Sequence, residues 1–224
     1  MFAYTAEVLF ALVAQYNAAI WPVQIAACFL AGLMLVHAVR PFGAWGDRLA
    51  GAALAAFWLW TAVAFQLAHM AAIDFTAPFA ALAFLLQGLL LAWTASFRGR
   101  VAFRFSRDAA GWLGLALALY GLAGHPAVLW LSGRGWPHTP LVGVTPGPTT
   151  LFTLGMLLLA AGRTPFHLAA IPLLWSFAAG IAAWWLRIPE DYVLPAAGIL
   201  ALCLILLKNR QDSLQRRRSA AKPV

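Results

Sequence analysis

Apolar positions are grouped along the chain into stretches of about 20 residues, the length that a helix needs to cross the hydrocarbon core of a bilayer. Short polar or proline-containing connections separate these stretches. We expect seven transmembrane helices, at residues 20–39, 48–70, 78–97, 109–131, 141–162, 165–186 and 189–207. The predicted fold class is therefore an all-α polytopic membrane protein. It has a single transmembrane domain over residues 1–207 and a basic tail over residues 208–224, which we expect to fray.

The segment before the first span, residues 1–19, has a different pattern. Thr5 stands ahead of Glu7 and of a mostly apolar run that ends at Gln15, which predicts a helix that begins near Thr5. A helix of roughly 11 residues is too short to cross a bilayer. We therefore expect an amphipathic N-terminal helix that lies along the membrane interface.

The fifth predicted span, residues 141–162, is the least regular. Its first half contains Gly143, Thr145, Pro146, Gly147 and Pro148. Because proline has no N–H and clashes with the preceding turn, the two prolines predict a helix start, with Thr145 as its N-cap. Non-helical backbone at membrane depth persists only where protein or a watery cavity surrounds it. We therefore expect a polar recess near one membrane surface.

The overall composition agrees with this assignment. The chain has 224 residues, of which 63% are hydrophobic and 10% are charged, whereas about a quarter of the residues of a soluble domain are charged. This composition leaves no room for a large soluble domain. Cys28 and Cys203 lie in apolar runs without CxxC spacing, so we interpret them as small buried hydrophobic residues rather than as metal ligands or disulfide partners.

The charged residues predict the orientation. All 15 Lys and Arg residues except Arg134 and Arg187 fall on one side of the predicted topology. By the positive-inside rule, the C-terminus is cytoplasmic and the N-terminus is outside. The alternating run RGRVAFRFSRD, residues 98–108, is expected to form a small hairpin or an interfacial loop on the basic side. The expected partner of that side is a bilayer with anionic headgroups, not nucleic acid.

Polar groups near membrane depth gather on the outer side, where buried polar residues are costly and often functional. The candidate ligand-binding residues are Asn17, Gln66, Asp74, Thr145, Thr149, Thr150, Glu190 and Asp191. Several of them have a structural alternative. Glu190 and Asp191 complement the dipole of a helix start, Asp74 can cap a turn, and Thr149 can bond to its own helix backbone.

Several chemistries are excluded. The sequence contains no HExxH, GxSxG or Walker motif, and no predicted span contains a lysine that could carry a retinal Schiff base. We predict no catalytic residue, no metal and no cofactor.

Three functions remain open. The favoured one is transport or binding of a small solute or ion through the outward-facing recess, as in transporters with discontinuous helices. The alternative is an accessory or assembly subunit of a larger membrane complex, because many Trp and Phe residues suit lateral packing. The third is an integral-membrane enzyme that acts on lipid or envelope precursors, with His138 or Asp191 as acid or base, although no nucleophile–base pair is recognisable.

Three stretches carry a resemblance to a known family: residues 16–24 (YNAAIWPVQ), 143–153 (GVTPGPTTLFT) and 188–191 (IPED). Together with Gln87-Gly88 and residues 171–176 (IPLLWS), the chain resembles an uncharacterised bacterial family of multi-pass membrane proteins, labelled only as a domain of unknown function. The resemblance covers nearly the whole chain. It implies a bacterial inner-membrane protein whose motifs face outward, and it implies no activity.

Overall fold

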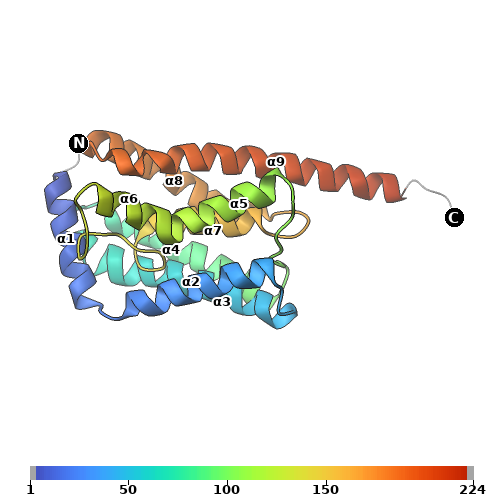
Figure 1. Ribbon diagram of the computed structural model, residues 1–224, viewed down its shortest axis with the longest axis horizontal. Coiled ribbons are helices and arrows are strands. Elements are labelled where there is room, and N and C mark those ends of the chain that lie inside the picture. The colour runs from blue at the N-terminus through green and yellow to red at the C-terminus, as the bar shows by residue number, and fades with distance from the viewer. Residues whose placement is uncertain (1–3, 221–224) are drawn as a thin grey trace.

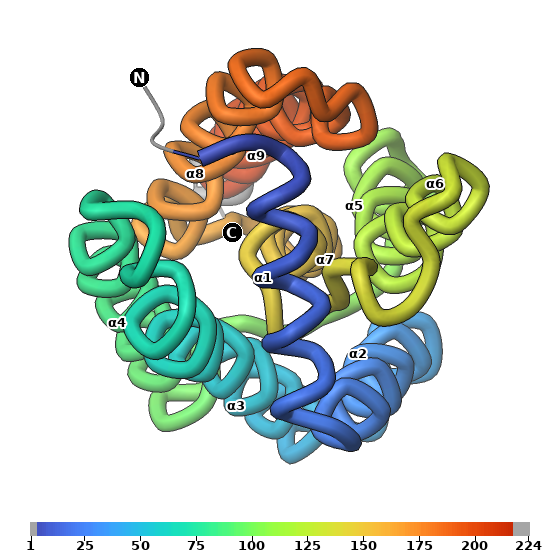
Figure 2. The backbone as a smooth tube through the Cα atoms, turned by 90° about the vertical axis from the view of Figure 1, so that its left-hand side faces the viewer, coloured from blue at the N-terminus to red at the C-terminus, as the bar shows by residue number. Residues whose placement is uncertain are grey.

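A short central helix, α7 (Pro146–Leu158), is surrounded by six other helices (Figure 2). In this computed structural model, which describes residues 4–220, every residue of α7 except Gly147 is buried. The surrounding helices are α2 (Val23–Val39), α3 (Ala44–Trp60), α4 (Ala77–Leu91), α5 (Ala109–Leu119), α8 (Phe166–Leu186) and α9 (Val193–Ala220). The described residues form no strand, so the prediction of an all-α fold is confirmed.

Some of the surrounding helices continue through wider or tighter turns. α3 is extended by a π-helical segment, Thr61–Leu67, and by a 3-10 turn, Met70–Ala72, and α4 is extended by a π-helical segment, Ala92–Phe97. α5 passes through the π-helical segment Tyr120–Gly124 into α6 (His125–Leu131). Pro126 explains the irregular turn before α6, because proline has no N–H and its ring clashes with the carbonyl one turn earlier.

Five helices in the described part of the chain are long and apolar enough to cross a membrane: Ala44–Ala72, Ala77–Phe97, Ala109–Leu131, Phe166–Leu186 and Pro189–Arg216. α1 (Ala6–Ala19) and α2 add a sixth if two helices bent by 90° are counted as one broken span. α7 is not among them. Its 13 residues extend for only about 20 Å, whereas the hydrocarbon core is about 30 Å thick.

The predicted span at residues 141–162 therefore contains a much shorter helix. Gly143 has a positive φ of 80° in the turn before α7, and Val142 and Val144 are buried there without being helical. Thr145 occupies the predicted N-cap position, but its hydroxyl donates to the carbonyl of Leu141 at 2.8 Å and makes no capping bond. The turn is apolar because it is buried, so hydropathy alone does not separate it from the helix.

α1 lies across one end of the bundle, which we call the α1 end (Figures 1 and 2). Thr5 caps it by accepting a bond from the Val8 N–H, as predicted. The helix runs to Ala19, beyond the predicted end near Gln15. Tertiary contacts explain the extra turn, because Tyr16 donates to the carbonyl of Val144 at 2.8 Å and Asn17 holds the loop before α7.

At the opposite end, residues 98–108 form a loop rather than a hairpin, tied to the exit of α7 by a single antiparallel bridge between Phe103 and Ala160. Arg104 binds the carboxylate of Asp47 through two hydrogen bonds, at 2.6 and 2.9 Å. Asp47 also accepts from the Phe103 N–H and lies 2.8 Å from Nε2 of His37. Arg104 is thus held by the protein at this end of the bundle.

The C-terminal end of α7 is also closed by protein groups. Thr164 donates its hydroxyl proton to the carbonyl of Leu157 at 3.1 Å, and the ammonium of Lys208 donates to the carbonyls of Leu158, at 2.8 Å, and Ala160. A cation placed there also complements the helix dipole. The sequence did not predict this contact, because Lys208 was assigned to the tail.

The basic tail differs from the prediction as well. α9 remains helical through residue 208 to Ala220 and runs along the bundle and beyond it (Figure 1). Asn209 exchanges two hydrogen bonds with the backbone of Thr164, and Asp212 pairs with Arg216 at 2.7 Å. These contacts keep the helix regular where fraying was expected.

Lys208→Met should destabilise the protein by about 1–3 kcal/mol, because two buried carbonyls at the end of α7 lose their donor. The measurement is thermal or denaturant unfolding in a mild detergent. Arg210→Met removes the same charge from an exposed position on the same helix and should change stability little. Equal effects of the two substitutions would contradict this role for Lys208.

Gly155→Ala should also be destabilising. A Cβ at residue 155 would lie 2.6 Å from the backbone nitrogen of Ala118 and from the carbonyl oxygen of Gly114, both on α5. Overpacking of this kind costs about 1–3 kcal/mol. Gly32 on α2 has open space around its Cβ position, so Gly32→Ala should be neutral or stabilising by up to about 1 kcal/mol. Unfolding curves that do not separate the two variants would contradict the close α5–α7 contact.

Candidate ligand-binding cavity

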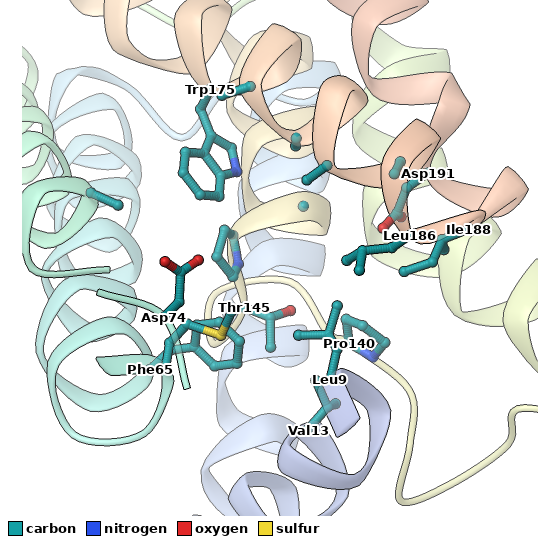
Figure 3. A pocket seen from close by; sticks show the side chains of 18 of the residues that line it. Leu9, Val13, Phe65, Asp74, Pro140, Thr145, Trp175, Leu186, Ile188 and Asp191 are labelled. Carbon is teal, nitrogen blue, oxygen red and sulfur yellow. The ribbon is translucent and has the colours of Figure 1, made fainter. Parts of the chain in front are cut away.

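A cavity of about 240 Å³ lies at the α1 end of the bundle, beside the start of α7 (Figure 3). Its walls come from α1, from the π-helical segment after α3, from the start of α4, and from α6, α8 and α9. Thr145, Pro146, Gly147 and Pro148 contribute the first turn of α7 to the lining. Of the three residues that begin α7, only Gly147 has a backbone N–H to offer, because prolines have none.

Three polar atoms in the lining have no hydrogen-bond partner among the described residues: Oε1 of Gln66, Nδ1 of His125 and Nε1 of Trp175. Gln66 and His125 are deeply buried, with 3% and 1% of their surface exposed. A buried polar atom without a partner costs about 1–3 kcal/mol, and such atoms are rare in folded proteins. The three residues come from three different helical segments, and all three line the cavity.

Two carboxylates lie on opposite sides of the cavity, with the indole of Trp175 above them (Figure 3). Asp191 accepts from Nε2 of His125 at 2.7 Å. Asp74 accepts from the N–H and the hydroxyl of Thr76, at 2.8 and 2.7 Å, and from the Tyr4 hydroxyl at 3.3 Å. Burial, and secondarily the charge of Asp74, raises the pKa of Tyr4 above its usual range, so this phenol remains a donor.

The cavity brings together four of the predicted site residues: Gln66, Asp74, Thr145 and Asp191. Whether they bind a ligand stays a prediction. They lie near one another because the connection after α3, the start of α7 and the start of α9 all meet at the α1 end.

The other four predicted residues do not line the cavity, and their bonds are mostly structural. Asn17 donates to the carbonyls of Pro137 and Thr139, at 2.7 and 2.9 Å. Thr149 donates to the carbonyl of Thr145 at 2.6 Å and accepts from the Gly143 N–H at 2.8 Å. Thr150 is fully buried, and its hydroxyl has no partner among the described residues. Glu190 forms an ion pair with Arg134 at 2.7 Å.

The sequence prediction did not include His125 and Trp175 in the site. His125 carried a usable signal, because an ionisable residue in a membrane-length apolar stretch is a candidate functional residue by default. Trp175 has no such signal in the sequence, because the face that α8 presents to the cavity is fixed only by packing. Leu9 and Val13 of α1 were also missed, because the predicted interfacial helix had no assigned position over the bundle.

The cavity offers binding groups rather than a recognisable catalytic set. His125 and Asp191 form a histidine–carboxylate pair, but among the described lining residues there is no Ser, Cys or Lys to act as a nucleophile beside it. No three His, Cys, Asp or Glu side chains in residues 4–220 are grouped in a way that would hold a metal ion.

The fold and the cavity define a class of protein: an α-helical bundle with several helices apolar enough to cross a membrane, built around a buried central helix with a cavity at its start. A family of unknown function, DUF6064, matches residues 6–216, and the chain belongs to this family. The expectation of an uncharacterised family is thereby confirmed. Neither a curated protein nor a solved structure matches the chain.

Proposed function

We propose that this protein is a multi-pass membrane protein that binds a small solute or ion in the cavity beside α7, as the first step of its transport. The observation that carries the proposal is the set of unpartnered polar atoms on Gln66, His125 and Trp175. The three residues line a cavity at the start of a short buried helix. Transporters commonly hold their substrates at the ends of helices that stop within the membrane.

The proposed topology has seven passes, with α7 as a short pass enclosed by the others. The N-terminus is outside, α1 lies at the outer interface of a plasma (inner) membrane, and the C-terminus is cytoplasmic. The charge distribution supports this orientation, because Arg134 and Arg187 are the only Lys or Arg residues in the connections at the α1 end. The cavity then faces outward.

Gln66→Leu should abolish ligand-induced thermal stabilisation without lowering the stability of the unliganded protein. Leucine has a similar size, and it removes a buried amide oxygen that has no partner among the described residues and therefore costs about 1–3 kcal/mol. The measurement is thermal unfolding of purified protein with a panel of small solutes and ions. At a concentration of 100 Kd, a ligand stabilises the wild type by about 2.7 kcal/mol.

Gln87→Leu is the matched control. Gln87 is equally buried, but its amide donates to the carbonyl of Leu168 at 2.8 Å and does not line the cavity. This variant should be less stable by about 1–3 kcal/mol, because a buried carbonyl loses its donor, and it should retain the ligand-induced shift. A wild type that no solute stabilises, or a Gln66→Leu variant that keeps the shift, would overturn the proposal.

The topology is tested with Ser132→Cys and Ser213→Cys in a background without Cys28 and Cys203. Both serines are exposed and both donate to a carbonyl four residues earlier, so the two substitutions are closely matched. A membrane-impermeant maleimide should label residue 132 in intact spheroplasts and residue 213 only after permeabilisation. The reverse pattern would invert the orientation, and labelling of both in intact spheroplasts would refute seven passes.

A further inference from the structure

We infer that the ligand of this cavity is a small organic cation, a protonated amine attached to an apolar body. The inference rests on the proposed function and names the class of solute. It is argued from the charge, the hydrogen-bonding character and the size of the cavity.

The charge of the lining is negative. Asp74 and Asp191 both line the cavity, and no Lys or Arg is among the described lining residues. Arg134, on the loop after α6, does not balance them, because it pairs with Glu190 at 2.7 Å and lies over the ring of Phe10. Asp191 keeps 29% of its side-chain surface exposed and contacts His125, and Asp74 is half-buried and accepts three hydrogen bonds. A cation in the cavity would add a positive charge near two carboxylates, beside which the lining places no Lys or Arg.

Two of the hydrogen-bonding groups without a partner are acceptors, and the two carboxylates add further acceptors. Nε2 of His125 lies 2.7 Å from the Asp191 carboxylate, so in the neutral ring this nitrogen carries the proton and Nδ1 is left as an acceptor. Oε1 of Gln66 is a second acceptor without a partner among the described residues, and the amide nitrogen of the same side chain is a donor. An ammonium group has three donors and no acceptor, so it complements this set. Trp175 offers the one indole donor in the lining.

The start of α7 does not make the cavity an anion site. Helix N-termini bind anions through several free backbone N–H groups that point at the ligand. Pro146 and Pro148 remove two of these donors, and the Thr149 N–H is directed to the carbonyl of Thr145 at 3.4 Å. The geometry that would favour phosphate or carboxylate is therefore largely absent from this helix.

The rest of the cavity is apolar and small. Leu9, Val13, Phe65, Met70 and Leu186 line it together with the face of Trp175 (Figure 3). Aromatic rings add a favourable interaction with a cation in a dry site. A volume of about 240 Å³ corresponds to about eight water molecules at 30 Å³ each. A ligand of this size has room for one charged group and a ring or short chain.

The test compares three probes of nearly equal size: benzylamine, benzyl alcohol and benzoate. Binding to wild-type protein in phosphatidylcholine nanodiscs is measured by isothermal titration calorimetry at pH 7, with empty nanodiscs as the blank. Benzylamine should bind saturably and at least about tenfold more tightly than benzyl alcohol, and benzoate should show no saturable binding. A tenfold difference corresponds to about 1.4 kcal/mol.

Two carboxamide variants test the role of the carboxylates. Asp191→Asn keeps an acceptor for His125. Asp74→Asn keeps an acceptor for Thr76, and its amide nitrogen replaces the oxygen that accepts from the Tyr4 hydroxyl. Each variant should weaken the affinity for benzylamine about tenfold and change the affinity for benzyl alcohol by no more than about twofold. Asp212→Asn, on the far part of α9, is the control and should change neither affinity.

The outcomes separate this inference from the proposed function. Tighter binding of benzyl alcohol or benzoate than of benzylamine would overturn the cationic ligand while leaving a ligand-binding cavity in place. Unchanged benzylamine affinity in both carboxamide variants would also overturn it. Absence of saturable binding by all three probes would overturn it as well. The proposed function is then judged by the solute panel and the Gln66→Leu variant.

Discussion

The constraint on which this structure depends is the enclosure of α7, which is buried everywhere except at Gly147. Its end groups cannot reach solvent, so each backbone donor or acceptor there must be satisfied by another part of the protein. Just before α7, the hydroxyl of Tyr16 on α1 donates to a backbone carbonyl. At its C-terminal end, Lys208 of α9 and Thr164 donate to the last carbonyls of the helix. These contacts fix where α1 and α9 lie. The cavity is a consequence of the same arrangement, since α1 covers the end of the bundle above the first turn of α7.

Close packing on one side makes the enclosure possible. α5 and α7 approach each other at Gly114 and Gly155, where no side chain separates the two backbones. Small residues have this role in helix pairs of membrane proteins, because association there depends on close contact rather than on the hydrophobic effect. The first turn of α7 is less closely packed at Gly147, where an added Cβ would meet only Leu194, at 3.7 Å. The polar atoms of Gln66 and Trp175 are left there without partners among the described residues.

The sequence was a good guide to what is local and a poor guide to what depends on packing. The prolines at 146 and 148 predicted the start of α7 correctly, and Thr5 predicted the start of α1. The length of α7 was not predictable, because the buried turns on both sides of it, such as Val142 and Leu159, are as apolar as the helix. Among the cavity residues, Asp74 and Asp191 were predicted because they stand in the polar connections between spans. The inward face of α8, and with it Trp175, was set by contacts that no sequence period reveals.

The central position of α7 also has a consequence for the order of assembly. A chain is synthesised from its N-terminus, so α2–α5 exist before α7 is made, and the ammonium that closes α7 belongs to a helix made later still. Until Lys208 emerges, the last carbonyls of α7 lack this donor. The interior of the molecule is therefore completed late in biosynthesis, and the earlier helices have to associate around a centre that is still vacant.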